Sequence, residues 1–176
     1  MPSRTRIDTS KIIAGALGGL AATAPMTLAM LAMHRALPRG QRYPLPPRKV
    51  TMNVLDALRL KRHLDEPQRK AATLVSHFGY GTVMGAIYAL LAPRVRLPGV
   101  LTGVTWGLIV WTASYLGLLP AADLHEPATR HPRERNALMI VAHIVWGAAL
   151  GLLTGPAEQG VQRAAEVAAR RATVSV

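Results

Sequence analysis

The chain has 176 residues, half of them apolar, and its 21 Lys and Arg against nine Asp and Glu give a formal charge of +12. Residues 12–33, 71–92, 99–122 and 137–155 nevertheless contain no Asp, Glu, Lys or Arg. About 20 helical residues cross a hydrocarbon core of about 30 Å. This distribution excludes a soluble fold with a basic surface and predicts one all-α integral membrane domain with four transmembrane helices. The absence of cysteine excludes disulfides and thiol catalysis.

The first predicted span, 12–33, follows three basic residues and contains Pro25. Proline lacks a backbone N–H, so it removes the helical hydrogen bond to the Ala21 carbonyl. Thr23 and Thr27 flank that carbonyl. We therefore expect an interruption of this helix about eight residues before its end, with polar groups beside it.

The loop 34–70 carries ten Lys and Arg residues. Arg39 to Lys49 is basic and rich in proline, which favours an extended, polyproline-like segment. Residues 53–64 are predicted to form a short helix with Asn53 as its N-cap, lying on the membrane surface against anionic lipid headgroups. No aromatic residues alternate with the basic ones, and nucleic-acid binding is therefore not predicted.

The second and fourth spans share a pattern. Ser76, His77, Tyr80, Gly81 and Gly85 match Ala142, His143, Trp146, Gly147 and Gly151, and each His lies six residues into its span. The pattern indicates two tandem helical hairpins related by a pseudo-twofold axis along the membrane normal. This symmetry would bring His77 and His143 to one depth, about 9 Å inside the membrane boundary.

Glycine recurs at four-residue spacing in all four spans. Small residues at this spacing let helix backbones approach closely in a membrane, where apolar burial supplies no net attraction between helices. The sequence therefore predicts a tight, glycine-rich bundle. The positions are Gly15 and Gly19; Gly81 and Gly85; Gly99, Gly103 and Gly107; Gly147, Gly151 and Gly155.

The loops set the predicted orientation. Loops 34–70 and 123–136 share one side and hold thirteen of the 21 basic residues. Short cytoplasmic loops are enriched in Lys and Arg. We expect these loops to be cytoplasmic and both termini to be outside, although the three basic residues before the first span argue for the reverse. The tail 156–176 is predicted to hold a short separate helix over 157–172.

Short motifs in three spans carry a family resemblance. Gly15, Gly19, Thr23, Pro25, Met26 and Thr27, together with the stretches from His77 to Tyr88 and from His143 to Gly151, resemble the YagU-like family of small, uncharacterised bacterial inner-membrane proteins. The resemblance covers the four spans and excludes the basic loop and the tail. It implies a bacterial inner-membrane location and a link to acid tolerance, and it supplies no catalytic residues.

The candidate site is a polar layer centred on the two intramembrane histidines. Ionisable groups inside membranes are rare and usually functional. The predicted ligand-binding residues are His77, His143, Tyr115, Thr27, Gly81 and Gly147. Ser114 of the third span lies at the same depth, and loop 123–136 would cover the layer.

Four interpretations of this layer stay open at the level of sequence. The histidines could hold haem b axially, with the glycines leaving room for the porphyrin. They could bind a divalent metal together with Asp123 or Glu126. They could relay protons or sense pH. Finally, they could be structural, hydrogen-bonded to Tyr115, Thr27 or a freed carbonyl.

The predicted function is binding of a small ligand, cofactor or ion at this layer. The alternative is a non-catalytic structural or assembly subunit of a membrane complex, or a homo-oligomer packed through glycine. Sequence signatures of phosphate-binding loops, zinc proteases and serine hydrolases are absent, and an enzyme is not predicted.

Overall fold

The computed structural model describes residues 9–92 and 97–174, and this part of the chain is helical with connecting turns and loops. Arg4 and Arg6, part of the predicted basic segment before the first span, lie outside the described residues. The main elements are α1 (Thr9–Ala36), α2 (Pro46–Ala57), α3 (Glu66–Leu91), α4 (Gly99–Thr112), the π-helix η4 (Ala113–Leu118), α5 (Leu119–Ala121) and α6 (Arg133–Val174). The 3-10 turns are η1 (Arg39–Gln41), η2 (Lys61–His63) and η5 (Ala128–Arg130).

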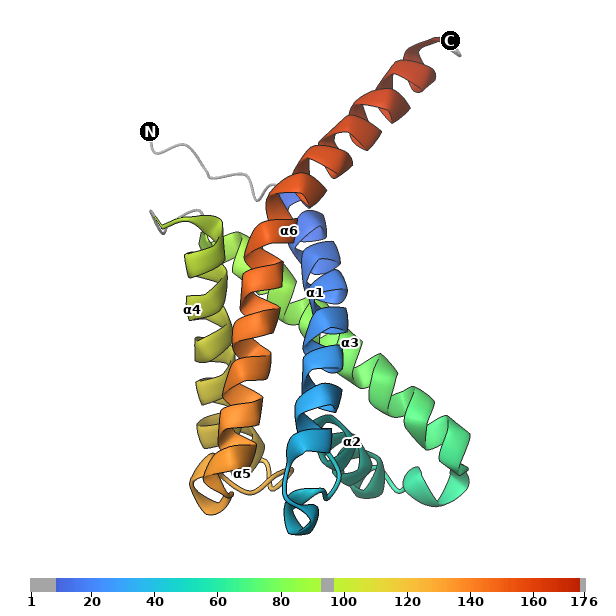
Figure 1. Ribbon diagram of the computed structural model, residues 1–176. Coiled ribbons are helices and arrows are strands. Elements are labelled where there is room, and N and C mark those ends of the chain that lie inside the picture. Colours follow the sequence, from blue (N-terminus) through green and yellow to red (C-terminus); the bar gives the residue numbers. More distant parts are fainter. Residues whose placement is uncertain (1–8, 93–96, 175–176) are drawn as a thin grey trace.

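Four segments of the described chain are long and apolar enough to cross a membrane: Thr9–Ala36, Glu66–Leu91, Gly99–Ala121 and Arg133–Ala165. This confirms an all-helical chain with four candidate spans. They pack in the order α3, α1, α6, α4, whereas α3 and α4 contact each other little. The start of α1 and the end of α6 lie at one end of the bundle, and α2 and α5 lie at the other, which we call the loop end (Figure 1).

Several glycines lie where the backbones of neighbouring helices meet. A Cβ atom built on Gly19 would lie 2.9 Å from the Cα atom of Gly85, and one built on Gly103 would lie 2.9 Å from the backbone nitrogen of Gly151. Side-chain carbons do not tolerate such contacts with backbone. Glycine therefore lets α3 cross α1, and α4 pack against α6, backbone to backbone.

The predicted twofold symmetry does not hold for one helix pair. Under that symmetry, the packing of α1 on α6 would be repeated by α4 on α3. Instead, α1 and α6 pack extensively and α3 and α4 do not. Below its crossing with α1, α3 runs obliquely away from the other spans, and α2 lies between α3 and the bundle (Figure 1).

The basic loop contains a short helix, as predicted, but its predicted bounds are wrong. Instead of an extended segment over 39–49 and a helix over 53–64, the structure has a helix from Pro46 to Ala57. Pro46 and Pro47 occupy its first turn, where a missing N–H breaks no helical hydrogen bond. Asn53 is not an N-cap, because it lies inside this helix, and its Nδ2 donates to the Leu124 carbonyl oxygen at 2.9 Å.

Two further boundaries differ from the prediction. The tail is not a separate helix, because α6 continues from Arg133 to Val174 with Pro156 inside it. At 1.5 Å per residue α6 is about 63 Å long, and its last part projects beyond the bundle (Figure 1). Pro25 likewise lies inside α1 without ending it. A change in helix type occurs instead in the third span, where α4 passes into the π-helix η4.

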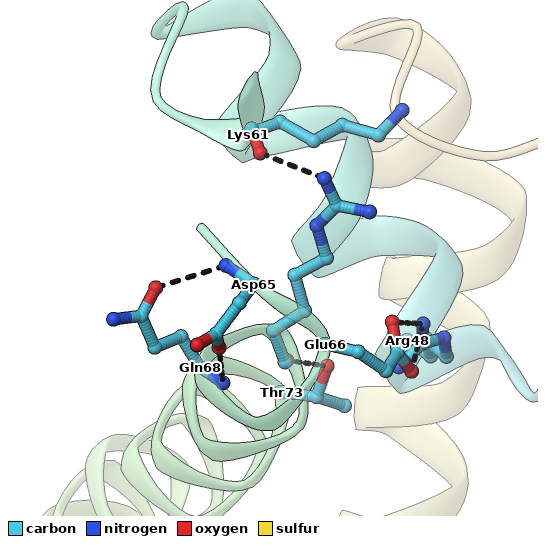
Figure 2. Close-up of polar contacts among 7 residues, drawn as sticks. Arg48, Lys61, Asp65, Glu66, Gln68 and Thr73 are labelled. Carbon is cyan, nitrogen blue, oxygen red and sulfur yellow. Dashed lines mark hydrogen bonds and ion pairs between the residues drawn. The ribbon is translucent and has the colours of Figure 1, made fainter. Parts of the chain in front are cut away.

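Polar contacts fix α2 against the start of α3 (Figure 2). Arg48 on α2 forms an ion pair with Glu66 at 2.8 Å. Asp65 accepts a hydrogen bond from the Gln68 backbone N–H at 2.8 Å, and the Gln68 side chain accepts one from the Asp65 N–H at 2.9 Å. This capping box satisfies two N–H groups at the start of α3. The Arg48–Glu66 pair thus joins α2 to α3 at the loop end, and the capping box fixes the start of α3.

Candidate functional site

A cavity of about 450 Å³ lies between α3 and the third span at the loop end. Its volume is within the range of about 300–1,000 Å³ that is usual for small-molecule sites. Residues of α2 form its floor, and residues of α1 and α6 form its back wall. Most of the lining is apolar. Its polar members are Thr23, Thr51, Ser76, His77, Tyr80, Ser114, Tyr115 and His143, with the indole of Trp146 beside them.

His143 reaches the cavity from α6 and is 5% exposed. Its Nδ1 lies 2.7 Å from the Met139 carbonyl oxygen. A carbonyl only accepts, so Nδ1 carries the hydrogen, and in the neutral ring Nε2 is then an acceptor with a free lone pair. The ring stands edge-on to Tyr115, with centroids 5.9 Å apart. His143 therefore presents a base nitrogen for a donor group.

His77 lines the same cavity from α3. Its Nε2 is buried, and no described residue forms a hydrogen bond with it. A buried polar atom without a partner destabilises a protein by about 1–3 kcal/mol. The structural interpretation, in which both histidines are hydrogen-bonded between helices, does not match these contacts, because His143 bonds within its own helix and Nε2 of His77 is unpaired.

The π-helix η4 places two buried polar residues at the cavity, Ser114 and Tyr115. The wider turn of a π-helix changes which side chains face inward, and such turns are frequent at functional sites. Oγ of Ser114 is hydrogen-bonded to the Tyr80 hydroxyl on α3 at 2.8 Å. Trp111 stacks on Tyr115 with centroids 6.5 Å apart. The third span is thereby linked to α3 across the cavity.

The structure brings together His77, His143, Tyr115 and Gly81 at one cavity, but not the other two predicted residues. Thr27 donates to the Thr23 carbonyl within α1 at 2.7 Å and does not line the cavity. Gly147 packs against α4, where an added Cβ would lie 2.9 Å from the Cα atom of Val104. Gly147 therefore serves helix packing, whereas Thr27 bonds within its own helix.

The predicted metal site with a loop carboxylate is not found. Among residues 9–92 and 97–174, no group of three or more His, Asp or Glu side chains could hold a metal ion. The Glu126 carboxylate instead lies 4.0 Å from the Lys49 ammonium. Asp123 lies in the loop with a positive φ of 53°.

A cluster of aromatic rings connects the cavity to the loop end. The His125 ring is 5.6 Å from the Tyr115 ring and 4.9 Å from the His131 ring. The Tyr43 hydroxyl lies 3.2 Å from Nδ1 of His131. Burial lowers the pKa of both His125 and His131. No residue of the loop 123–136, which the structure describes in full, lines the cavity, so the expectation that this loop covers the site is wrong; α2 covers it at the loop end, and the loop contacts the site only through the His125 ring beside Tyr115.

Sequence reasoning missed the role of Arg135 and of α2. The Arg135 guanidinium is buried and donates to the carbonyls of Gln41, Tyr43 and Pro44 at 2.8, 3.1 and 3.2 Å. It also lies 3.6 Å from the centroid of the Tyr43 ring. These contacts hold the segment just before α2 against α6. The Pro46–Pro47 pair could have indicated the helix start, because proline is common in a first turn.

The fold and cavity define a class: all-helical proteins with four candidate membrane-spanning helices around a histidine-lined internal site. The chain belongs to the family described as "Protein of unknown function (DUF1440)", whose profile matches residues 38–152. The matched stretch runs from just before η1 into α6 and includes both cavity histidines. No curated protein and no solved structure matches the chain.

Proposed function

We propose that this protein binds a small ligand in the cavity between α3 and the third span, at His77 and His143. The cavity itself carries the proposal. Two histidines from different spans line it, and each has an Nε2 atom without a protein partner that would use it. A polar group of the ligand would bind Nε2 of His143, while the apolar lining would bind its body.

The alternative, a structural or assembly subunit, accounts less well for these features. Protein interiors are close-packed, and large voids are rare. A helix bundle that served packing alone would gain by filling a cavity of about 450 Å³ and by pairing the His77 ring nitrogen. The glycine contacts join α1 to α3 and α4 to α6, and although Gly81 also lines the cavity, these contacts do not require it.

The proposed location is the bacterial inner membrane, with the loop end in the cytoplasm. The four candidate spans, the basic loops at one end and the YagU-like motifs support this proposal. Arg59, Lys61 and Arg62 near the end of α2 would meet anionic headgroups there. The link to acid tolerance is part of the same proposal, supported by the histidines that surround the site.

Analysis of co-purified compounds tests the proposal. The full chain is expressed in bacterial membranes and purified in mild detergent, and its organic extract is examined by mass spectrometry. Val54→Trp places a large ring in the cavity from α2, whereas Leu58→Trp adds the same ring at a position 61% exposed. We expect a compound enriched with wild type and Leu58→Trp and lost from Val54→Trp. Equal extracts from all three proteins would instead favour the structural alternative.

A visible spectrum and metal analysis of the same preparations separate the cofactor hypotheses. Haem between the histidines would give a Soret band that His77→Ala and His143→Ala remove. A divalent metal would be present at a fixed ratio to protein and lost from the same variants. Colourless, metal-free protein with a co-purified organic compound would leave a small organic ligand as the occupant.

A further inference from the structure

We infer that the ligand is a neutral lipid bearing a hydroxyl group, which enters the cavity sideways from the bilayer between α3 and η4. This inference rests on the proposed ligand-binding function and specifies the chemical class of the ligand. It follows from three features of the cavity: its mouth, its lack of charge and the hydrogen-bonding state of His143.

The mouth of the cavity is apolar and lies on two candidate spans. Val75 on α3 and Leu118 on η4 both line the cavity, yet they are 73% and 61% exposed. They therefore stand at the edge of the opening. Their spans, Glu66–Leu91 and Gly99–Ala121, would be surrounded by acyl chains in a membrane. An apolar opening at this place admits molecules dissolved in the bilayer.

The remaining sides of the cavity are occupied by protein. At the loop end, Thr51 of the α2 floor contacts Ser76 of α3 through their hydroxyls at 2.5 Å. At the other end, Nε1 of Trp106 donates to the Met84 carbonyl at 3.0 Å and links α4 to α3. α1 and α6 close the back. The Tyr80 hydroxyl and Oγ of Ser114, 2.8 Å apart, also join α3 to η4. The opening beside Val75 and Leu118 therefore lies between this bond and the α2 floor, and access there requires no rearrangement of these contacts.

Charge defines the ligand further. None of the described residues that line the cavity is Asp, Glu, Lys or Arg. An ion taken from water into such a site loses its hydration and gains no counter-charge. The cavity therefore favours a neutral molecule over a fatty acid anion, an amine or a charged phospholipid headgroup.

The tautomer of His143 indicates which head group the ligand carries. Because Nδ1 of His143 donates to the Met139 carbonyl, its Nε2 can only accept. A hydroxyl donates to this atom, whereas an ether or ester oxygen has no hydrogen to donate. His77 lines the same cavity, but its unpaired Nε2 is buried, so the structure assigns the hydroxyl contact to His143.

The test uses the isoprenoid alcohol farnesol as the probe. Tritiated farnesol is bound to the full chain in nanodiscs of zwitterionic phosphatidylcholine, with empty discs as the blank. Farnesyl methyl ether, which lacks the donor, and the farnesoate anion compete for the site. Because one hydrogen bond distinguishes alcohol from ether, we expect farnesol to bind about threefold to tenfold more tightly than the ether. Farnesoate should compete more weakly than either.

Two variant pairs locate the contact and the entrance. His143→Phe keeps an aromatic ring beside Tyr115 and removes the acceptor, so farnesol affinity should fall to that of the ether while the ether's affinity stays unchanged. Val75→Trp narrows the mouth and should slow farnesol binding. Val83→Trp, at a position on α3 that is 53% exposed and outside the cavity lining, should not.

The outcomes separate this inference from the proposed function. Equal affinity for farnesol and ether, tighter binding of farnesoate, or no binding of any probe would overturn the lipid class. After any of these results, the proposed ligand-binding function would still hold if wild type retained another co-purified compound that was absent from Val54→Trp. If Val54→Trp changes neither probe binding nor the co-purified compounds, both proposals fail.

Discussion

The two cavity histidines share a sequence pattern but have different surroundings. In both spans the histidine is followed by an aromatic residue and a glycine. This shared pattern was sufficient to predict that the two histidines belong to one site. It could not predict their hydrogen bonds, because these depend on side-chain rotamers and on the departure of α3 from the bundle. His143 is bonded within its helix, and Nε2 of His77 has no partner.

This difference predicts opposite effects on stability without ligand. His77→Leu removes an unpaired buried nitrogen, and we expect unchanged or slightly higher stability. His143→Leu removes the hydrogen bond to the Met139 carbonyl and should lower stability by about 0.5–1.5 kcal/mol. Thermal unfolding of delipidated protein in detergent measures both. The reverse order would show that His77 has a structural partner.

The histidine pair in the loop predicts a response to acid. Burial lowers the pKa of His125 and His131 below 6.5. The unfolded loop therefore binds more protons, so the stability of the folded loop is complete above about pH 6.5 and declines as the pH falls toward the lowered pKa values. The surrounding titratable and charged groups are Tyr43, Lys49, Tyr115, Glu126 and Arg135.

Hydrogen exchange checks this response. Amides of residues 123–131 should lose protection between pH 7 and pH 5, after correction for the intrinsic rate. The variant His125→Phe replaces the titrating ring by one that cannot be protonated, and it should reduce this loss of amide protection. A loop whose protection is independent of pH would mean that protonation of this pair is not coupled to its folding.

Among the elements, α2 differs most from its sequence prediction and matters most for the site. The proline-rich composition suggested an extended segment, because proline often breaks structure. In the fold, Pro46 and Pro47 begin the helix, and Asn53 and Thr51 bind it to the α5 loop and to α3. Because α2 contacts both the loop after α5 and α3, the helix that was predicted to lie on the membrane surface forms the cavity floor.

Close helix packing predicts a strong effect of one methyl group. In Gly103→Ala the new carbon would meet the backbone of α6, so α4 must move, and we expect a loss of about 1–3 kcal/mol. Gly79→Ala is the matched control, because a Cβ there meets nothing within 4 Å. Unfolding in mixed detergent and sodium dodecyl sulfate compares them. Equal stability of the two variants would argue against the close α4–α6 approach.

At the scale of the whole molecule, the four candidate spans were predictable and the cavity was not. Charge-free stretches of sufficient length identify spans locally. The repeated motif, by contrast, suggested a symmetric bundle in which α3 and α4 would pack together. The structure separates them at the loop end, and the cavity occupies that place.

The proposed orientation is testable because the chain has no cysteine of its own. Arg62→Cys labels the loop end and Gly160→Cys labels the projecting part of α6, both at exposed positions. A membrane-impermeant maleimide should modify Gly160→Cys in intact spheroplasts and Arg62→Cys only after lysis. The opposite pattern would place the basic loops outside.

The central claim is that the cavity between α3 and the third span holds a ligand. Its most direct measurement is the amount of organic compound extracted per mole of purified protein, compared between wild type, Val54→Trp and Leu58→Trp. We expect a defined compound that wild type and Leu58→Trp retain and that is absent from Val54→Trp. Identical extracts from all three folded proteins would contradict it.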